Sequence, residues 1–155
     1  MREIKVNPHK AMSEEERALF AASLSEIERV SFSDPWSEKS FLESFDDPSV
    51  MLVTLLDDQA LLAYALYAVL APEAELLNLA VLPSARRGGL ATALLASCDE
   101  VLKAQAVSDI FLEVRESNTA ARALYTARGF LAVGKRKNYY RYPTEDAIVM
   151  MSRLD

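Results

Sequence analysis

The segment Arg86-Arg87-Gly88-Gly89-Leu90-Ala91 is the part of the chain best suited to bind an anion. It follows an apolar run that ends at Pro83 and precedes the helical spacing of Leu90, Leu94 and Cys98, which places it between a strand and a helix. The first amides of a helix have no partner within the helix and lie at the positive end of its dipole, where phosphate groups bind. Glycines let a ligand approach the backbone closely, and the two arginines add positive charge. We therefore predict a loop that holds a pyrophosphate.

The loop differs from the two commonest nucleotide-binding motifs. It lacks the Gly-Lys-Ser/Thr ending of nucleoside triphosphate loops and the Gly-x-Gly-x-x-Gly pattern of dinucleotide-binding folds. Taken alone, so short a motif is more often a turn with solvated arginines than a binding site. The choice between these two interpretations therefore depends on the rest of the chain.

Glu113 and Tyr125 carry side chains that can move protons. Glu113 lies near the end of the otherwise apolar run 110–114, and it is either a general base or a surface carboxylate paired with Arg115. Tyr125 is either a proton donor, with an ordinary pKa of about 10, or a core aromatic residue. Asn118 lies seven residues before Tyr125, so the two share one face of a helix.

Three aromatic residues, Trp36, Tyr139 and Tyr140, are candidates to line an acceptor site. Because adjacent side chains of a strand point to opposite faces, only one of the two tyrosines should reach a substrate, and the other should lie in the core. The sequence does not tell which. Cys98 falls on the buried stripe of its helix and is predicted to pack there. His9, in a predicted loop, has no visible acid or nucleophile partner.

The first third of the chain predicts a strand over residues 1–7 and two helices. Ser13-Glu14-Glu15-Glu16 is a capping box that starts the first helix. The predicted buried stripe of this helix consists of Phe20, Leu24, Ile27 and Val30. Ser37 is predicted to cap a short second helix. The apolar residues of that helix are Phe41, Leu42 and Phe45.

The remaining two thirds predict six strands and two helices. The strands cover approximately residues 50–56, 60–70, 75–82, 107–114, 130–140 and 147–154. One helix starts at Leu90, and a second, capped by Ser117, runs to Arg128 and ends at Gly129. The order is therefore β-α-α-β-β-β-α-β-α-β-β, with no internal repeat or linker. This order predicts a single α/β domain, residues 1–155, built on a mixed sheet flanked by helices.

Composition limits the classes of function. Seventeen basic and 23 acidic residues give a net charge of -6, which argues against a broad nucleic-acid footprint and favours cationic substrates such as amines or basic peptides. One cysteine and one histidine are too few for the usual zinc sites, so no metal is expected. No apolar run approaches the ~20 residues of a membrane helix, and no secretory signal is visible. We expect a cytoplasmic protein with no membrane partner, and the sequence does not determine its oligomeric state.

Seen with its neighbours, the loop resembles the coenzyme A loop of the GNAT acetyltransferase superfamily. It reads Arg86-x-x-Gly89-x-Ala91 after the run 77–83, and the superfamily's later motif matches Asn118, Ala123-Leu124-Tyr125 and Gly129-Phe130. The resemblance implies a GNAT-like domain with a mostly antiparallel sheet and acetyl-coenzyme A (acetyl-CoA) as co-substrate. The cofactor-binding residues that it implies are Leu79, Ala80, Val81, Arg86, Arg87, Gly88, Gly89, Leu90, Ala91, Thr92 and Asn118.

Shorter motifs resemble one branch of the superfamily, the bacterial ribosomal-protein-alanine N-acetyltransferases. These motifs are Asp34-Pro35-Trp36-Ser37-Glu38, Leu112-Glu113-Val114-Arg115, Asn138-Tyr139-Tyr140 and Glu145-Asp146-Ala147. The match covers most of residues 34–154. Two positions depart from the pattern, because Arg86 stands where Gln is common and Ala91 where a second Gly is common. Arginine keeps the donor role, and alanine inside a helix needs no positive φ, so both changes are compatible with binding.

The branch resemblance implies direct acetyl transfer to a protein N terminus. Glu113 would be the general base, needed because an α-amino group with a pKa of about 7.7–8.0 is mostly protonated at neutral pH, and Tyr125 the general acid for the departing thiolate. Trp36, Tyr139 and Tyr140 would form a narrow slot for a chain that starts with a small residue. In this branch that residue is the alanine of the eighteenth small-subunit ribosomal protein.

Two other functions remain open at this stage. One is acetyl transfer to a small amine such as a polyamine or an aminoglycoside, which the acidic composition also fits. The other is a non-catalytic acyl-CoA-binding module, against which the presence of Glu113 and Tyr125 counts. Backbone amides of residues 79–81 would hold the thioester oxygen only if their strand separates from its neighbour, and a sequence cannot show such a separation.

Overall fold

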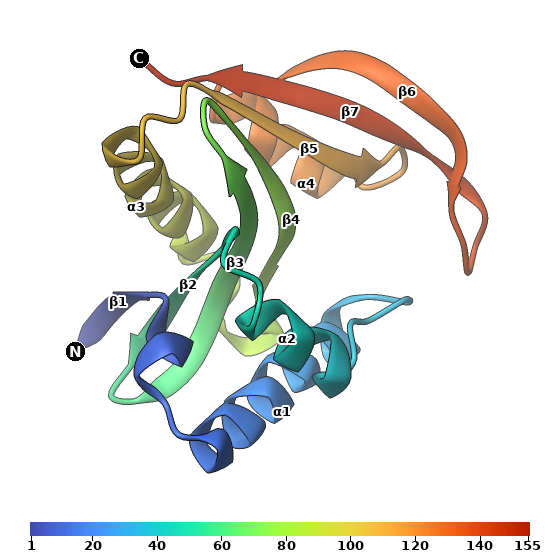
Figure 1. Cartoon of the computed structure of the whole chain (residues 1–155). Helices are drawn as coiled ribbons and strands as arrows, with labels where there is room; N and C mark the ends of the chain where they lie inside the picture. The colour runs from blue at the N-terminus through green and yellow to red at the C-terminus, as the bar shows by residue number, and fades with distance from the viewer.

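The computed structural model describes residues 1–155 and contains one seven-stranded sheet with helices on both faces (Figure 1). The strands are β1 (Arg2–Val6), β2 (Val50–Asp57), β3 (Ala60–Leu70), β4 (Glu73–Val81), β5 (Asp109–Arg115), β6 (Leu131–Tyr140) and β7 (Glu145–Arg153). Their order across the sheet is β1-β2-β3-β4-β5-β7-β6. Only the β4–β5 pair is parallel. The predicted element order and the mostly antiparallel sheet are confirmed.

Four α-helices and two short 3-10 helices connect the strands. They are η1 (Pro8–Ala11), α1 (Glu14–Ser31), α2 (Glu38–Phe45), η2 (Pro83–Ala85), α3 (Leu90–Ala104) and α4 (Thr119–Ala127). The capping box is confirmed, because Ser13 accepts a hydrogen bond from the Glu16 amide and Glu16 accepts one from the Ser13 amide. The cap at Ser37 is also confirmed. None of the helices is both long and apolar enough to cross a membrane.

Two local predictions about the helices were wrong. Val30 is 44% exposed, and the buried stripe of α1 continues instead at Glu28, four residues after Leu24. Asn118, not Ser117, caps α4, because its side chain accepts a hydrogen bond from the Ala121 amide. A one-residue shift of a cap is the usual uncertainty of helix boundaries.

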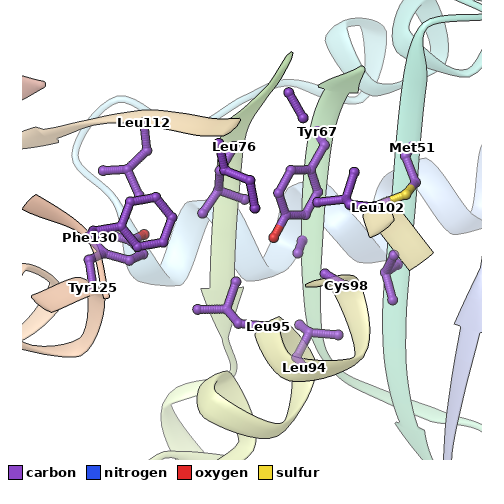
Figure 2. Packing of buried hydrophobic residues seen from close by; sticks show 14 of the residues in the cluster. Met51, Tyr67, Leu76, Leu94, Leu95, Cys98, Leu102, Leu112, Tyr125 and Phe130 are labelled. Carbon is purple, nitrogen blue, oxygen red and sulfur yellow. The ribbon is translucent and has the colours of Figure 1, made fainter. Parts of the chain in front are cut away.

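The larger core lies between the sheet and the helices α3 and α4 (Figure 2). Cys98 packs there as predicted, fully buried. The ion pair between Asp99 and Arg128, 2.7 Å long, fixes the end of α4 against α3. A second, smaller core lies on the opposite face, where α1 and α2 pack against β2, β3 and β4. The sheet is therefore packed between α3 and α4 on one face and α1 and α2 on the other.

His9 lies in this second region and not in a loop, contrary to the prediction. It belongs to η1, is fully buried, and stacks on Phe45 with ring centroids 5.0 Å apart. Burial, helped by the nearby charges of Arg17 and Lys10, lowers the pKa of the imidazole. His9 is therefore a neutral core residue.

The sheet opens between β4 and β5. Their parallel pairing covers only Glu73–Leu76 of β4 and Asp109–Leu112 of β5, although both strands continue beyond it. A register shift between Leu66 and Tyr67 leaves one residue of β4, Leu77, without a partner on β3 at this point. Such a bulge bends a strand and increases its twist. The two strands therefore separate after Leu76, as Figure 1 shows.

Candidate active site

A cavity of about 780 Å³ lies at the gap between β4 and β5. It brings together residues from the first helix to the last hairpin. Seven of the residues predicted from the sequence line it: Trp36, Leu79, Glu113, Asn118, Tyr125, Tyr139 and Tyr140. The loop residues 86–92 do not line this cavity and lie instead at the start of α3. The structure therefore separates the predicted residues into a reaction cavity and a loop beside it.

Glu113 points away from the main core, on the face of β5 opposite Leu112 and Val114. Its side chain is only 16% exposed. The expected alternative, a pair with Arg115, is wrong. The partner is Arg136 of β6, whose Nε lies 2.5 Å from Glu113 Oε2. This carboxylate oxygen is buried and accepts no hydrogen bond from the chain.

Tyr125 belongs to α4 and lies in the larger core, on the other side of the sheet from Glu113 (Figure 2). Its ring packs edge-to-face on Phe130 with centroids 5.7 Å apart, and the residue is 8% exposed. Burial, and to a lesser degree the nearby Tyr140, raises the pKa of Tyr125 above its ordinary value. The phenol is therefore protonated throughout the neutral range and can donate a proton into the cavity.

The gap exposes backbone amides of β4. The Leu82 amide donates to Leu62 of β3, and amides of an antiparallel strand point alternately to its two edges. The amides of Leu79 and Val81 therefore point away from β3, whereas that of Ala80 points toward it. No strand pairs with β4 on that open edge beyond Leu76. Two preorganised donors at an open strand edge are suited to bind a carbonyl oxygen.

The loop before α3 has the form of an anion site. Gly89 caps the helix with φ 72° and without a side-chain hydrogen bond. The first bond of the helix is donated by Ala93 to Gly89, which leaves the amides of Leu90, Ala91 and Thr92 free at the helix start. A Cβ placed at Gly89 would meet nothing within 4 Å, so the space in front of these amides is open. The loop therefore fits a pyrophosphate group.

Two arginines of the loop have conformations that the sequence did not indicate. Arg87 has φ 68°, in the left-handed region, as does Gly89. The guanidinium of Arg86 points away from the loop. It donates hydrogen bonds to the Val81 carbonyl and to Ser31 Oγ, at 3.1 and 3.2 Å. Arg86 therefore joins the loop to the end of β4 and to α1.

The two tyrosines of β6 do not divide between cavity and core, contrary to the prediction. Both line the cavity, and their rings meet edge-to-face at 5.1 Å. The alternation of β6 breaks before them, because its register with β7 shifts between Arg136 and Tyr140 and Asn138 has φ 52°. Burial and the carboxylate of Glu113 raise the pKa of Tyr140 to about 12. Trp36 faces the same cavity and packs against Phe41 with centroids 5.4 Å apart.

Comparison with known proteins identifies the family. The model of the acetyltransferase (GNAT) family matches residues 21–130, which include the loop, Glu113 and Tyr125. The chain belongs to this family. GNAT enzymes use acetyl-CoA as the acetyl donor, in agreement with the form of the loop. No group of three or more His, Cys, Asp or Glu side chains is placed to hold a metal ion.

One curated relative and two solved structures show what this GNAT chain is similar to. It is 40% identical to the [ribosomal protein bS18]-alanine N-acetyltransferase of Salmonella typhimurium over 81% of the chain and 85% of the relative. The crystal structure of the ribosomal-protein-S18-alanine N-acetyltransferase from Escherichia coli superposes with a TM-score of 0.86 at 32% identity, covering 100% and 95% of the two chains. Ard1 from Thermoplasma volcanium shares the fold, with a TM-score of 0.84 at 22% identity over 99% and 98%.

The GNAT cavity also contains residues that the sequence did not single out. Glu28 of α1 is 1% exposed, and it accepts hydrogen bonds from the Trp36 amide, at 3.0 Å, and from the hydroxyl of Tyr64. Asn78 Oδ1 is buried at the cavity without a partner. The position of Glu28 was available from the sequence, since it follows Leu24 by one helical turn. The position of Asn78 depends on the bulge in β4 and had no such signal.

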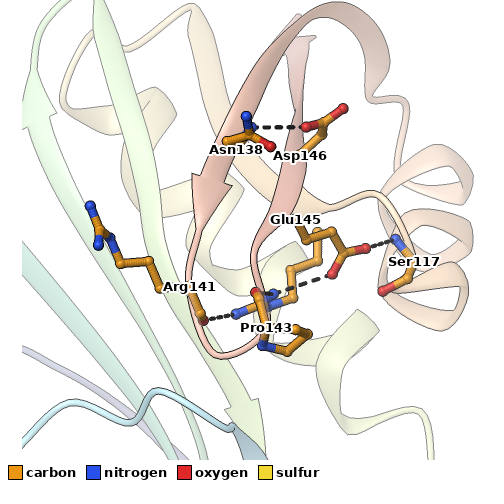
Figure 3. Close-up of polar contacts among 7 residues, drawn as sticks. Ser117, Asn138, Arg141, Pro143, Glu145 and Asp146 are labelled. Atoms are coloured by element: carbon orange, nitrogen blue, oxygen red, sulfur yellow. Dashed lines mark hydrogen bonds and ion pairs between the residues drawn. The ribbon is translucent and has the colours of Figure 1, made fainter.

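A polar network holds the β6–β7 hairpin beside the cavity (Figure 3). Arg115 donates to the carbonyls of Arg141 and Pro143 at 2.7 and 2.9 Å and pairs with Glu145 at 3.2 Å. The guanidinium also lies 4.6 Å from the centroid of the Tyr140 ring. Glu145 in turn accepts a hydrogen bond from the amide of Ser117. Arg115 therefore positions the wall of the cavity, since its five donors satisfy several acceptors at once.

Proposed function

We propose that the protein transfers the acetyl group of acetyl-CoA to the α-amino group of a protein N terminus, the N-terminal alanine of ribosomal protein bS18. The observation that carries this proposal is the cavity that joins Glu113 to Tyr125 across the gap between β4 and β5. The similarity to the bS18-alanine N-acetyltransferases over most of both chains supports the choice of acceptor.

Acetyl-CoA supplies an activated acetyl thioester when it is bound. The amides at the start of α3 would hold its pyrophosphate. The residues of this loop are Arg86, Arg87, Gly88, Gly89, Leu90, Ala91 and Thr92. Asn118 lines the cavity beside this path. The amides of Leu79 and Val81 would donate hydrogen bonds to the carbonyl oxygen of the acetyl group.

Glu113 and Tyr125 divide the proton transfers in this proposal. Glu113 accepts a proton from the α-ammonium group of the acceptor, which makes the amine nucleophilic. Tyr125 donates the proton of its hydroxyl to the departing sulfur. Trp36, Tyr139 and Tyr140 form the walls of the slot for the first residue of the acceptor. The bulk of three aromatic side chains favours a small residue such as alanine there.

The proposal is tested by mass spectrometry of peptides after incubation with acetyl-CoA. A peptide with the N-terminal sequence of bS18 should gain one acetyl group, located at its α-amino group by fragmentation. The same peptide with a blocked N terminus should remain unchanged, which controls for acetylation of lysine side chains. Acetylation of polyamines or aminoglycosides with no acetylation of the free peptide would refute the proposed acceptor and would favour a small-amine acetyltransferase.

A further inference from the structure

A second hollow lies on the sheet face that α1 and α2 leave partly uncovered. These helices pack over β2, β3 and β4, whereas β6 is exposed along nearly its whole length. The hollow has a volume of about 470 Å³. We call this hollow the trough, and its lining includes Leu70, Glu73, Glu75, Phe111, Arg136 and Val149.

The trough is continuous with the candidate active site. Glu75 and Glu113 line both the trough and the cavity at the gap. Strand register explains why, since Glu75 pairs with Phe111 across β4 and β5, and Glu113 is the next residue of β5 on the same face. A chain whose amino group lies at Glu113 therefore has a direct path into the trough.

The trough combines apolar and acidic surface. Phe111 and Val149 are partly exposed, and Leu70 is 82% exposed. Two carboxylates, Glu73 and Glu75, stand along these apolar side chains. Burial and the neighbouring Glu113 raise the pKa of Glu75. Exposed apolar residues framed by charge of one sign are typical of a surface that binds a peptide of the opposite charge.

A cation of the chain itself already occupies one end of the trough. Arg136 lines the trough and contacts Glu113 with its guanidinium, while 61% of its side chain remains exposed. Because Arg136 is the exposed partner of this pair and Glu113 the buried one, the guanidinium can turn into solvent when another cation takes its place at Glu113. The contact also demonstrates that a guanidinium fits at this point of the trough.

We infer that the trough binds the segment of the acceptor polypeptide that follows its N-terminal residue, and that it selects segments carrying both basic and apolar side chains. This inference rests on the proposed function, because it requires an acceptor that is a polypeptide. Glu73 and Glu75 of β4 lie on the same face of the sheet as Phe111 of β5 and Val149 of β7. A segment that lies across this face can therefore place basic side chains on the two carboxylates and apolar ones on Phe111 and Val149.

The kinetic test reverses the charge of Glu73. Of the two trough carboxylates on β4, Glu73 lies farther from Glu113 than Glu75 does. Glu73→Lys should raise KM about three- to tenfold for an Ala-starting peptide with basic and apolar residues, and leave KM unchanged for a dipeptide amide that starts with alanine. Glu3→Lys makes the same charge change on β1, at the opposite edge of the sheet, and should leave KM for both substrates unchanged. Replacing the basic residues of the long peptide by serine should remove the effect of Glu73→Lys.

A trapping experiment tests the same surface without turnover. Cys98 is fully buried, so a cysteine introduced at Leu70 is the only accessible thiol. The peptide is a basic Ala-starting peptide whose one cysteine, placed after its first residue, is activated as a mixed disulfide with thionitrobenzoate. Leu70→Cys should displace thionitrobenzoate and form a disulfide with this peptide several times faster than Leu19→Cys. Leu19 is the matched control, since it is 72% exposed on α1 and outside the trough.

The outcomes separate the trough from the proposed function. Equal KM values of the Glu73→Lys and Glu3→Lys proteins for the long peptide, or equal trapping at Leu70→Cys and Leu19→Cys, would overturn the inference. So would a response of KM to Asp34→Lys alone, because Asp34 lines the cavity but not the trough. Selective trapping without acetylation of any peptide would instead refute the proposed function and retain the peptide-binding surface.

Discussion

Replacing Tyr125 by phenylalanine removes one oxygen atom from the candidate cavity and retains the packing of the ring. The edge-to-face contact with Phe130 and the burial of the side chain are equally available to phenylalanine. The hydroxyl has no hydrogen-bond partner in the chain, and it is not among the fully buried polar atoms without a partner. It therefore opens into the cavity, and its removal should affect chemistry and not folding.

The size of the effect follows from the proposed role. A positioned general acid contributes about 10²–10⁴-fold to a rate, so kcat/KM should fall by that factor, which corresponds to about 3–5 kcal/mol in the activation free energy. The free energy of unfolding should change by less than about 0.5 kcal/mol, because no hydrogen bond within the chain is lost. The two quantities are measured by thiol release with an Ala-starting peptide and by urea denaturation.

Tyr67 offers a matched control in the same core (Figure 2). It is 1% exposed, and burial together with the neighbouring Cys98 thiol raises the pKa of its hydroxyl well above the ordinary value. Tyr67→Phe should therefore lower the free energy of unfolding by about 1 kcal/mol and leave kcat/KM unchanged. Wild-type kcat/KM in Tyr125→Phe would refute the proposal that Tyr125 donates the proton. A loss of activity in Tyr67→Phe as large as that in Tyr125→Phe would show that core packing, and not proton donation, explains the result.

Three further outcomes are expected. Glu28→Ala leaves two donors without their acceptor, so the free energy of unfolding measured in urea should fall by about 2–4 kcal/mol. Glu28→Gln should lose less of this free energy, and equal losses in the two variants would contradict the hydrogen-bonding role. Arg115→Lys loses the forked contacts of the hairpin and the stacking on Tyr140, so KM for the peptide should rise about two- to tenfold while KM for acetyl-CoA stays constant. The pKa of His9 is lowered in the folded protein, so the unfolded state binds more protons and the free energy of unfolding falls as the pH drops below about 6.5. His9→Phe should reduce this dependence of stability on pH. Identical curves of unfolding free energy against pH for the two proteins would argue against a neutral buried His9.

Most of the fold could be predicted because its signals are local. The capping box at Ser13, the cap at Ser37 and the left-handed Gly129, with φ 96°, are each recognised from a few adjacent residues. The errors arose where packing decides between similar local patterns. Glu28 and Val30 lie one and three residues after Ile27, and only contact with the sheet determines that the charged one is buried.

The site was predictable in its residues but not in its geometry. The motifs identified Glu113 and Tyr125 from their order in the chain, and the structure places both on one cavity. The ion pair of Glu113 with Arg136 joins strands that are not neighbours in the sheet, so no spacing in the sequence reports it. The two tyrosines of β6 were misassigned because the alternation rule assumes a regular strand, which the register shift after Arg136 interrupts.

The gap between β4 and β5 explains how two groups on opposite faces of a sheet can act on one reaction. Glu113 lies on the face of the trough and Tyr125 on the face of α3 and α4, and the main chain of a continuous sheet would separate them. Beyond Leu76 and Leu112 this barrier is absent, so donor and acceptor can enter from opposite faces and meet in the gap. The chain then needs no residue to carry the acetyl group between them. Cys98, its one thiol, is unsuited to that task, because it is fully buried and burial raises its pKa to about 12.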